Sequence, residues 1–499
     1  MLVSTHAKKK HQVAIIGLDG MSWEILLQYL DHLPNTRRVI DESFLGVLKC
    51  VPPLTLPSWT SIFTGVKMNK HGIYGFTKYV KIGDSVQATF FNSRDVKIPR
   101  LSEILALNGY QVLVVGQPPS YPLQGWYPRN QILVYDATSP KPFIYPPKYS
   151  KYLRFFKYLN HEYVKPSEAP ERILVKLIKC IASRIRGLEL LLMETNIDAL
   201  IIVFPETDSA MHIKPNIADK KIDTLYLKLL QYIDDFVGYV AKKFDIVLLV
   251  SDHGMQCYLK SINLAKILNN LNNIRGSALR RKMASLLNNC IVGILLYLAM
   301  RHDLSYKIYR HLRLAIRNLL KLKDTEPKIQ EDNARRKVLL DQIDVHDSWI
   351  LYLTDEKIVE WVIRKIREVF ANTLRIVDVF RTETGMYAVH VMPQYGFFID
   401  FDKANPKSIP WHPTTAHNPY GIFALKCSSL SDSNGYVGVV NNYDVLPTIL
   451  NVLDIPLPSY IDGQAVQVGR IKKREQISID YRPFWKLARK TYWLRYGIK

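Results

Sequence analysis

Apolar residues along this chain form short, almost continuous runs that are separated by amphipathic stretches. The run at 13–18 is bounded by polar and charged residues, which is typical of a strand buried on both faces of a parallel sheet. Similar runs occupy 112–115, 199–204, 246–250 and 421–425. Each of these runs predicts a buried strand.

Helical patterns lie between these runs, at 22–30, 101–107 and 223–244. Strands that alternate with helices are typical of α/β proteins. The sequence therefore predicts a doubly wound, mostly parallel sheet that is flanked by helices.

Two regions interrupt this alternation. In residues 260–323 the pattern is helical, and many lysines and arginines face a single acidic residue, Asp303. We interpret 259–345 as an inserted basic helical subdomain, a possible lid over the strand ends. Residues 349–400 predict a strand, a helix at 356–370 and strands that return to the sheet. The catalytic core would then comprise 11–258 and 346–465, followed by a basic, aromatic tail at 466–499.

Composition narrows the class of protein. Hydrophobic residues make up 48% of the chain and charged residues 22%, as in ordinary globular proteins. The five cysteines are scattered without a CxxC pair, which argues against a disulfide framework and against a cysteine metal site. Residues 1–12 lack the apolar region of a signal peptide, and the longest apolar run, 290–300, is too short to cross a bilayer. We therefore expect a soluble, cytoplasmic protein.

The formal net charge is +22, and the isoelectric point is near 9.5. Such a charge attracts polyanions, anionic lipid surfaces or a phosphorylated substrate. A generally basic surface without a dedicated partner explains the same charge.

Acidic residues and histidines follow several predicted strands directly. Asp19 follows the first strand, Asp208 follows 199–204 with His212 four residues later, and Asp252 and His253 follow 246–250. Sites in open α/β sheets form beyond the carboxyl ends of the strands, so these side chains are expected to converge. Aspartate and histidine without cysteine suit zinc, with manganese as the alternative. Taken singly, each aspartate is equally well a helix cap and each histidine an ordinary core or surface residue.

Thr55 is the candidate nucleophile. It lies between an extended, proline-containing stretch and a predicted helix in which Pro57 favours the first turn. A helix N-terminus favours an anionic oxygen, and a nearby cation can hold a threonine hydroxyl as an alkoxide. The alternative interpretation is a simple threonine cap.

Six stretches, in order along the chain, add a signal that is stronger than any single residue. They are Gly17-Leu18-Asp19-Gly20; Leu54-Thr55-Leu56-Pro57-Ser58, continued by Thr64-Gly65 and His71-Gly72-Ile73; Glu206-Thr207-Asp208 with His212; Ser251-Asp252-His253-Gly254-Met255; His417-Asn418-Pro419; and Asp444-Val445-Leu446-Pro447-Thr448. With them the chain resembles the alkaline phosphatase superfamily and, within it, the type I phosphodiesterase and nucleotide pyrophosphatase family. The resemblance spans 13 to about 465, except for the basic insertion.

The resemblance implies a hydrolase that uses two divalent metal ions and a covalent phospho-threonine intermediate. One metal, which activates the nucleophile, would be held by Asp19, Thr55, Asp252 and His253. The second, which stabilises the leaving oxygen, would be held by Asp208, His212 and His417. His417 is assigned by the resemblance alone. The expected substrate is a small phosphorylated molecule such as a nucleotide or a phosphodiester.

Departures from the family pattern bear on the substrate. Nucleotide pyrophosphatases usually place an asparagine after the His-Gly-Ile stretch, but here Tyr74-Gly75-Phe76 follows, and Asn92 is distant. Trp59 occupies the position of the sulfatase arginine, and Thr55 that of the sulfatase cysteine, which disfavours sulfate esters.

Two alternatives stay open. One is a phosphomonoesterase with the same metal centre. The other is a degenerate hydrolase fold that binds nucleic acid, another anionic polymer or an anionic membrane through residues 260–323. The sequence does not specify an oligomeric state.

Overall fold

The computed structural model describes most of the chain outside the basic insertion. The described residues are 11–82, 85–123, 130–159, 168–214, 217, 222–258, 261–263, 350–353, 356–370, 374–393, 398–400, 414–428, 434–469 and 477–487. The predicted helical subdomain at 259–345 thus lies outside the described residues, except for 261–263. The chain forms two compact units, the first from 1–74, 92–256 and 417–499, the second from 75–91 and 257–416.

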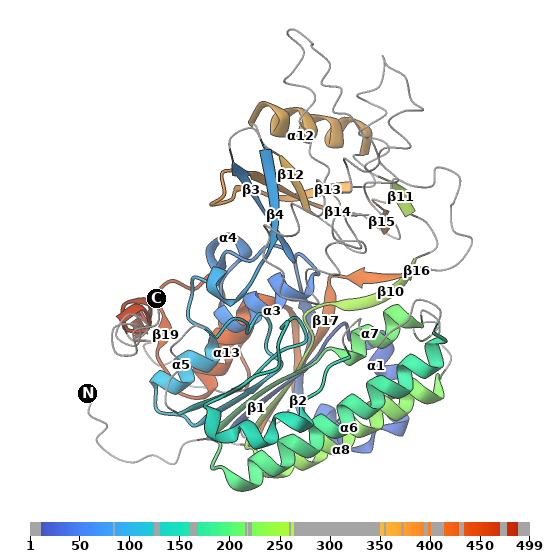
Figure 1. Cartoon of the computed structure of the whole chain (residues 1–499), viewed down its shortest axis with the longest axis vertical. Coiled ribbons are helices and arrows are strands. Elements are labelled where there is room, and N and C mark those ends of the chain that lie inside the picture. The colour runs from blue at the N-terminus through green and yellow to red at the C-terminus, as the bar shows by residue number, and fades with distance from the viewer. Residues whose placement is uncertain are drawn as a thin grey trace, which may run out of the picture. The chain divides into compact units, whose positions relative to one another are not determined.

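The first unit is built on a nine-stranded sheet in the order β18-β2-β17-β9-β1-β8-β5-β6-β7 (Figure 1). Parallel pairs join β1 to β8 and β9, β5 to β6 and β8, and β2 to β18, whereas β17 and β7 run antiparallel to their neighbours. The predicted mostly parallel sheet is confirmed, and each of the five apolar runs is a strand or lies within one. The strands are β1 (Val13–Leu18), β2 (Ser43–Lys49), β5 (Val112–Val115), β6 (Gln131–Val134), β7 (Ile144–Tyr145), β8 (Ala199–Phe204), β9 (Ile246–Val250), β17 (Tyr420–Cys427) and β18 (Gly435–Asn441).

Helices cover both faces of this sheet because successive strand residues point to opposite faces and both sets are apolar. Ala14, Ile16 and Leu18 belong to a core cluster with α6 and α8, whereas Val13 and Ile15 belong to a second cluster with α3, α5 and α13. The helices are α1 (Trp23–Tyr29), α2 (Pro34–Asp41), α3 (Thr55–Thr64), α4 (Met68–His71), α5 (Leu101–Leu107), α6 (Pro170–Glu194), α7 (Glu206–Ile213), α8 (Thr224–Lys243) and α13 (Val445–Val452).

The first residues of the predicted helices at 22–30 and 223–244 are the N-caps of α1 and α8. The Ser22 hydroxyl accepts a hydrogen bond from the Ile25 N–H at 3.4 Å, and α1 begins at the next residue. The Asp223 carboxylate accepts hydrogen bonds from the first turn of α8 in the same way. Such caps satisfy N–H groups that have no partner within the helix, and so they fix where each helix begins.

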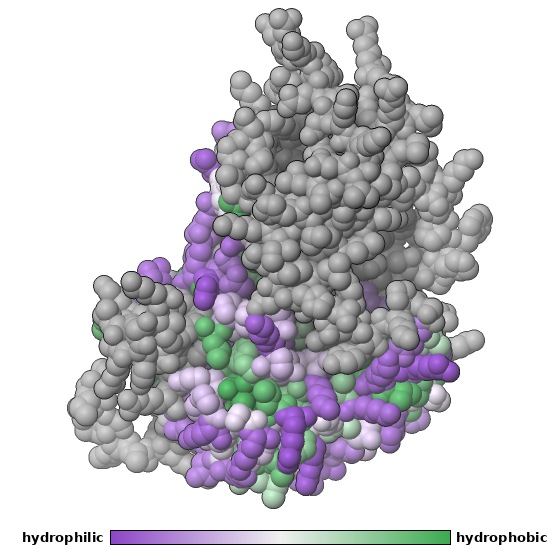
Figure 2. Space-filling view, in the orientation of Figure 1, coloured by the Kyte–Doolittle hydropathy of each residue, from purple (hydrophilic) through white to green (hydrophobic). Residues whose placement is uncertain are grey.

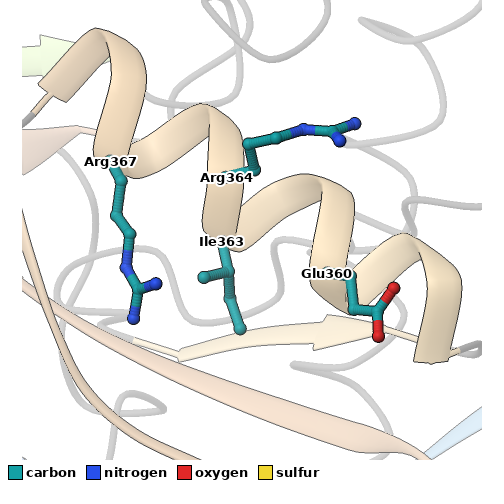
Figure 3. A pocket seen from close by; sticks show the side chains of 4 residues that line it. All are labelled: Glu360, Ile363, Arg364 and Arg367. Carbon is teal, nitrogen blue, oxygen red and sulfur yellow. The ribbon is translucent and has the colours of Figure 1, made fainter.

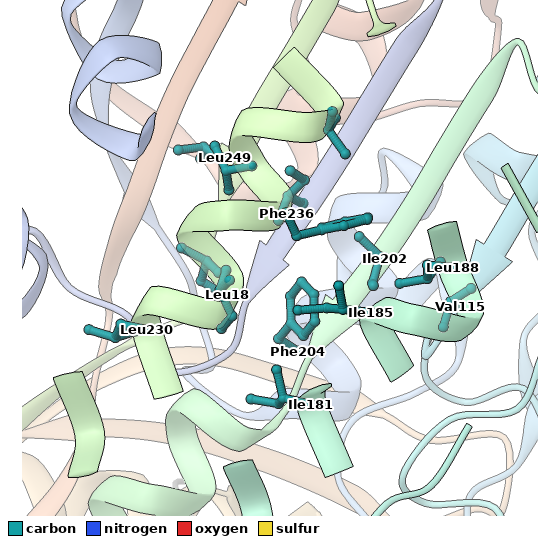
Figure 4. Packing of buried hydrophobic residues seen from close by; sticks show 14 of the residues in the cluster. Leu18, Val115, Ile181, Ile185, Leu188, Ile202, Phe204, Leu230, Phe236 and Leu249 are labelled. Atoms are coloured by element: carbon teal, nitrogen blue, oxygen red, sulfur yellow. The ribbon is translucent and has the colours of Figure 1, made fainter. Parts of the chain in front are cut away.

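The core between the sheet and the α6–α8 layer is densely aromatic and aliphatic. Ile181, Ile185 and Leu188 of α6 face Phe204 of β8 and Phe236 of α8 (Figure 4). The two phenylalanine rings meet edge to face, with centroids 6.1 Å apart. On the opposite, outer side of these helices, Figure 2 shows hydrophilic residues interspersed with apolar ones.

The second unit contains smaller sheets. One is the hairpin β3 (Thr77–Ile82) with β4 (Ser85–Phe90), another the parallel pair β11 (Ser261–Asn263) with β15 (Phe398–Asp400). A three-stranded antiparallel sheet, ordered β12-β14-β13, combines with α12. Their bounds are β12 (Ile350–Leu353), α12 (Glu356–Phe370), β13 (Leu374–Arg381) and β14 (Tyr387–Pro393).

This three-stranded sheet corrects one expectation. The predicted strand and helix within 349–400 are present, but the strands that follow pair with β12 instead of returning to the large sheet. Alternation of apolar and polar residues indicates that a segment is a strand and gives no information about which strand it will pair with.

The remaining strands are short. They are β10 (Gly254–Tyr258), β16 (Thr414–Asn418), β19 (Leu457–Pro458) and β20 (Ser478–Ile479). In the tail, residues 482–487 are helical, and Tyr481 and Trp485 are buried. Among the described helices, none combines the length and the hydrophobicity that crossing a bilayer requires.

The substitution Phe204→Ala should destabilise the first unit strongly. The ring is fully buried, and loss of a buried phenylalanine costs about 3–5 kcal/mol in free energy of unfolding. Leu27→Ala is the control because Leu27 is 58% exposed, and its loss should cost under about 0.5 kcal/mol. Urea denaturation of both variants measures the difference, and equal losses would contradict the packing described for Phe204.

Candidate functional site

The carboxyl ends of three adjacent strands lie in register. Leu18 at the end of β1 is opposite Phe204 of β8, and Gly17 is opposite Val250 of β9. The residues that follow these strands therefore emerge at one edge of the sheet, as the sequence predicts. They include Asp19 after β1, Asp208 on α7 after β8, and Asp252 and His253 after β9.

His417 reaches this edge by a different route. It precedes β17, whose Phe423 is opposite Val250 of β9 in an antiparallel pair. The beginning of an antiparallel strand lies beside the ends of its parallel neighbours. A search restricted to residues after strands misses His417; the available signal was the resemblance of His417-Asn418-Pro419 to a family motif.

Asp19, Asp252 and His253 form the first group of candidate metal ligands. Nε2 of His253 lies 3.4 Å from Oδ1 of Asp19 and 3.3 Å from Oδ2 of Asp252. All three side chains are buried. The structure thus brings together two carboxylates and one imidazole from two neighbouring strand ends.

Asp208, His212 and His417 form the second group. Oδ1 of Asp208 lies 3.4 Å from Nε2 of each histidine, and the two Nε2 atoms are 2.9 Å apart. Asp208 and His212 are four residues apart on α7, so they project from one side of the helix. His417, on β16, completes the group.

The two groups are immediate neighbours. The rings of His253 and His417 stack with centroids 3.7 Å apart and planes inclined by 21°. Gly20 also lies between the groups: its N–H donates to Oδ1 of Asp252 at 3.3 Å. A Cβ at Gly20 would be 2.8 Å from Oδ1 of Asp208, and the backbone there has a φ of +69°. Both the close contact with Asp208 and the positive φ therefore require glycine at this position.

Further hydrogen bonds orient the candidate ligands. The Trp59 indole N–H donates to Oδ2 of Asp19 at 3.2 Å and leaves Oδ1 directed toward His253. Nδ1 of His417 lies 2.9 Å from the carbonyl oxygen of Pro53. An Nδ1–H that donates to a carbonyl leaves Nε2 as the lone-pair donor, and this arrangement is usual for histidines that bind metals.

Unpartnered buried atoms test whether a cation fits here. Oδ1 of Asp19, Oδ1 of Asp208, Oδ2 of Asp252 and Nε2 of His253 have no hydrogen-bond partner among the described residues. Buried polar atoms without partners are costly and call for an explanation. Burial and then the negative charges of Asp19 and Asp208 hold the pKa of Asp252 well above its usual value. A divalent cation at each group would satisfy these atoms and offset the charge, so the donor sets fit metal ions.

Thr55 is the first residue of α3. The capping position belongs to Leu54, which makes no side-chain cap hydrogen bond, so Thr55 is not the simple cap of the alternative interpretation. Pro57 lies in the first helical turn, as predicted. The N–H groups of this turn and the helix dipole favour a negatively charged oxygen beside Thr55.

The chain on both sides of Thr55 contacts candidate ligands. Before it, the carbonyl of Pro53 bonds to His417; after it, the Ser58 hydroxyl donates to the carbonyl oxygen of Asp252 at 2.5 Å. Thr55 thus lies in a segment that contacts the second group through Pro53 and the first group through Ser58.

Two other residues considered in the sequence have structural roles. The Asn92 side chain accepts a hydrogen bond from the Arg94 N–H and caps a short turn. His71 is fully buried: its Nδ1 accepts from the Ile73 N–H, and its Nε2 lies 3.0 Å from the Ser61 hydroxyl. Desolvation by burial lowers the pKa of His71 to about 3, so the ring is a neutral part of the core.

One cavity lies elsewhere, beside α12 in the second unit. It has a volume of about 460 Å³ and is lined by Glu360, Ile363, Arg364 and Arg367 (Figure 3). A lining with one carboxylate and two arginines is a poor cation site, and neither group of candidate metal ligands is part of it.

Comparison with known proteins identifies the family. A family model described as type I phosphodiesterase/nucleotide pyrophosphatase matches residues 13–354, which is more than half of the chain. The chain belongs to this family. It is therefore a hydrolase of phosphoester bonds, and the family depends on metal ions. A search of curated protein sequences finds no match.

Solved structures resemble the chain over nearly its whole length. Alkaline phosphatase PafA is 13% identical with a TM-score of 0.52, over 92% of this chain and 99% of that one. Murine ectonucleotide pyrophosphatase/phosphodiesterase 5 in complex with AMP is 12% identical with a TM-score of 0.47, over 92% and 98%. Phosphonoacetate hydrolase from Sinorhizobium meliloti with phosphonoformate is 13% identical with a TM-score of 0.49, over 89% and 95%. The likeness to PafA shows an alkaline phosphatase-like fold.

Trp59→Phe isolates the hydrogen bond to Asp19. The substitution keeps the aromatic ring that stacks on Phe63 and removes only the N–H donor. If Asp19 binds a metal, the affinity for one ion should fall about 10- to 100-fold. Calorimetric titration of chelator-treated protein with zinc measures this affinity.

Trp23→Phe is the matched control for this experiment. It removes an indole donor that bonds to the Gly46 carbonyl at 2.7 Å instead of to a candidate ligand, and should leave both affinities unchanged. Equal effects of the two substitutions would refute the orienting role of Trp59.

Proposed function

We propose that this enzyme cleaves phosphoesters with two divalent metal ions and with Thr55 as its nucleophile. The observation that carries the proposal is the pair of neighbouring Asp/His groups around the N-terminus of α3. Membership of the type I phosphodiesterase/nucleotide pyrophosphatase family supports phosphoester hydrolysis independently of this geometry.

Each metal has its own set of ligands in this proposal. Asp19, Asp252 and His253, with the Thr55 hydroxyl, would hold the first ion. Asp208, His212 and His417 would hold the second. When bound, two cations supply Lewis-acid stabilisation to the attacking and leaving oxygens of an in-line displacement. Mixed carboxylate and imidazole donors favour zinc, with manganese as the alternative.

Thr55 provides the covalent step. Its Oγ1 attacks phosphorus and gives up its proton, the bond from phosphorus to the leaving-group oxygen breaks, that oxygen leaves with a proton, and a phospho-threonine forms. Water then attacks the same phosphorus, the bond from phosphorus to Oγ1 breaks, and a proton from the water restores the threonine hydroxyl. The N–H groups at the start of α3 favour negative charge on the phosphoryl oxygens during both displacements.

The proposed substrate is a small phosphodiester or a nucleotide. The family match supports this class, and Trp59 in place of the sulfatase arginine argues against sulfate esters. The described residues do not include the region 264–349, so its roles as a lid or as a surface for anionic polymers or membranes stay predictions.

Thr55→Ala should reduce turnover by at least about 10³-fold while the metal content stays near that of the wild type, because nucleophile removal leaves only binding and electrostatic contributions. Thr55→Ser should retain much more activity, since it keeps a hydroxyl. Thr64→Ala is the control, because that hydroxyl bonds to the Thr60 carbonyl in the same helix. Steady-state kinetics and elemental analysis give both readouts, and full turnover by Thr55→Ala would exclude Thr55 as nucleophile.

The preference for diesters has its own test. We expect higher kcat/KM for bis(nitrophenyl) phosphate than for nitrophenyl phosphate, because the two substrates share a leaving group and differ in the second ester. A preference for the monoester would mean that the enzyme is a phosphomonoesterase instead of a phosphodiesterase. It would not affect the proposed metal ligands.

A further inference from the structure

A charged pair is buried where α6 meets the first residue of α7, two residues before Asp208. The guanidinium of Arg184 on α6 forms a bidentate ion pair with the carboxylate of Glu206 on α7, with one contact of 2.9 Å. The exposed fractions of the two side chains are 0% and 2%. Neither residue belongs to the candidate ligand groups.

Arg184 is held firmly by other contacts. Its guanidinium lies 3.9 Å from the centre of the Tyr158 ring, and Nη2 donates to the Lys157 carbonyl at 2.7 Å. Gly187, about one turn later on α6, permits the close approach of the preceding segment, because a Cβ there would be 2.6 Å from Cβ of Phe155. The planar fork of arginine is suited to such combined stacking and bidentate bonding.

Glu206 is the first residue of α7, the helix that carries Asp208 and His212. The next residue, Thr207, donates its hydroxyl to the Asp19 carbonyl at 2.6 Å. The first turn of α7 is therefore attached to α6 on one side and to the strand end that carries the first group on the other. Because α7 has only eight residues, a rotation of its first turn would move both ligands.

Stability alone is a weak reason for such a pair. Taking two charges out of water carries a large desolvation cost, and replacing a buried ion pair with apolar residues of similar volume is often neutral or stabilising. The bidentate geometry does fix the orientation of a helix start, which an apolar contact would leave less defined.

We propose that Arg184 and Glu206 are positioning residues that orient α7 so that Asp208 and His212 meet His417 in metal-binding geometry. This inference rests on the proposed function, since it assumes that the second group binds a metal ion. It assigns no contact with substrate to either residue.

The double variant Arg184→Met/Glu206→Leu tests the inference. It removes both charges together and so leaves no unpaired buried ion. Zinc titration of the chelator-treated protein should show wild-type affinity for one ion and about 10- to 100-fold weaker affinity for the other, the usual size of an outer-shell effect. Circular dichroism and the thermal midpoint of the metal-free protein should stay close to those of the wild type.

Asp234→Asn is the matched control. Asp234 is a buried carboxylate on α8 that accepts the Thr36 N–H at 2.6 Å and contacts neither group. Its substitution should leave both zinc affinities unchanged. A similar loss of zinc affinity in this control would show a general effect of weakened packing and overturn the inference.

The remaining outcomes separate the inference from the proposed function. Two wild-type zinc affinities in the double variant would overturn the inference alone, whereas a wild-type protein that binds no zinc or manganese would overturn the metal mechanism itself. If the double variant does not fold, the variant Arg184→Lys decides, because it keeps both charges and removes the bidentate fork. Weaker binding of one ion in that variant supports positioning. Loss of the fold in both variants would make the pair structural and overturn the inference.

Discussion

Three carboxylates meet at one buried edge of the sheet, and the rest of the site is arranged around the negative charge that they bring there. Asp19 and Asp252 are almost completely enclosed, and Asp208 is close enough to raise the pKa of Asp252. Such a cluster is unfavourable in a low-dielectric interior unless protons or cations neutralise it. In the proposed mechanism, lone pairs of the nearby histidines would help to bind such cations. Hydrogen bonds from Trp59 to Asp19 and from Gly20 to Asp252, and the contact of His417 with the Pro53 carbonyl, orient three of these side chains.

The large sheet brings the members of this cluster together. Parallel strands bring distant positions to a common edge, and the apolar packing on both faces supplies the stability that offsets a polar site. Asp19, Asp252 and His253 lie in the loops just beyond β1 and β9, whereas Asp208 and His212 lie on α7 and His417 lies on β16. The apolar strand residues therefore supply the rigid scaffold, and the polar residues next to them in the chain form the site.

Sequence reasoning succeeded where a local pattern determines the structure. The apolar runs located β1, β5, β8 and β9, and the positions of Asp19, Asp208, Asp252 and His253 after strands predicted their convergence. It failed where the structure depends on which strands pair with each other. Nothing local indicates that β17 is antiparallel, which is why His417 required a family motif, and nothing local indicates that β13 and β14 pair with β12. The pair between Arg184 and Glu206 was likewise out of reach, because it joins two helices whose contact depends on the tertiary packing.

The antiparallel β17 has a consequence for how the site comes into being. His417 lies 205 positions after His212, beyond the whole of the second unit, yet it closes the second group. During synthesis, the first group is encoded early, while the second stays incomplete until the chain has passed the second unit and β17 has added itself beside β9. A protein built in this way cannot assemble both ligand sets on a prematurely terminated chain, so the order of the strands ties its chemistry to completion of its fold.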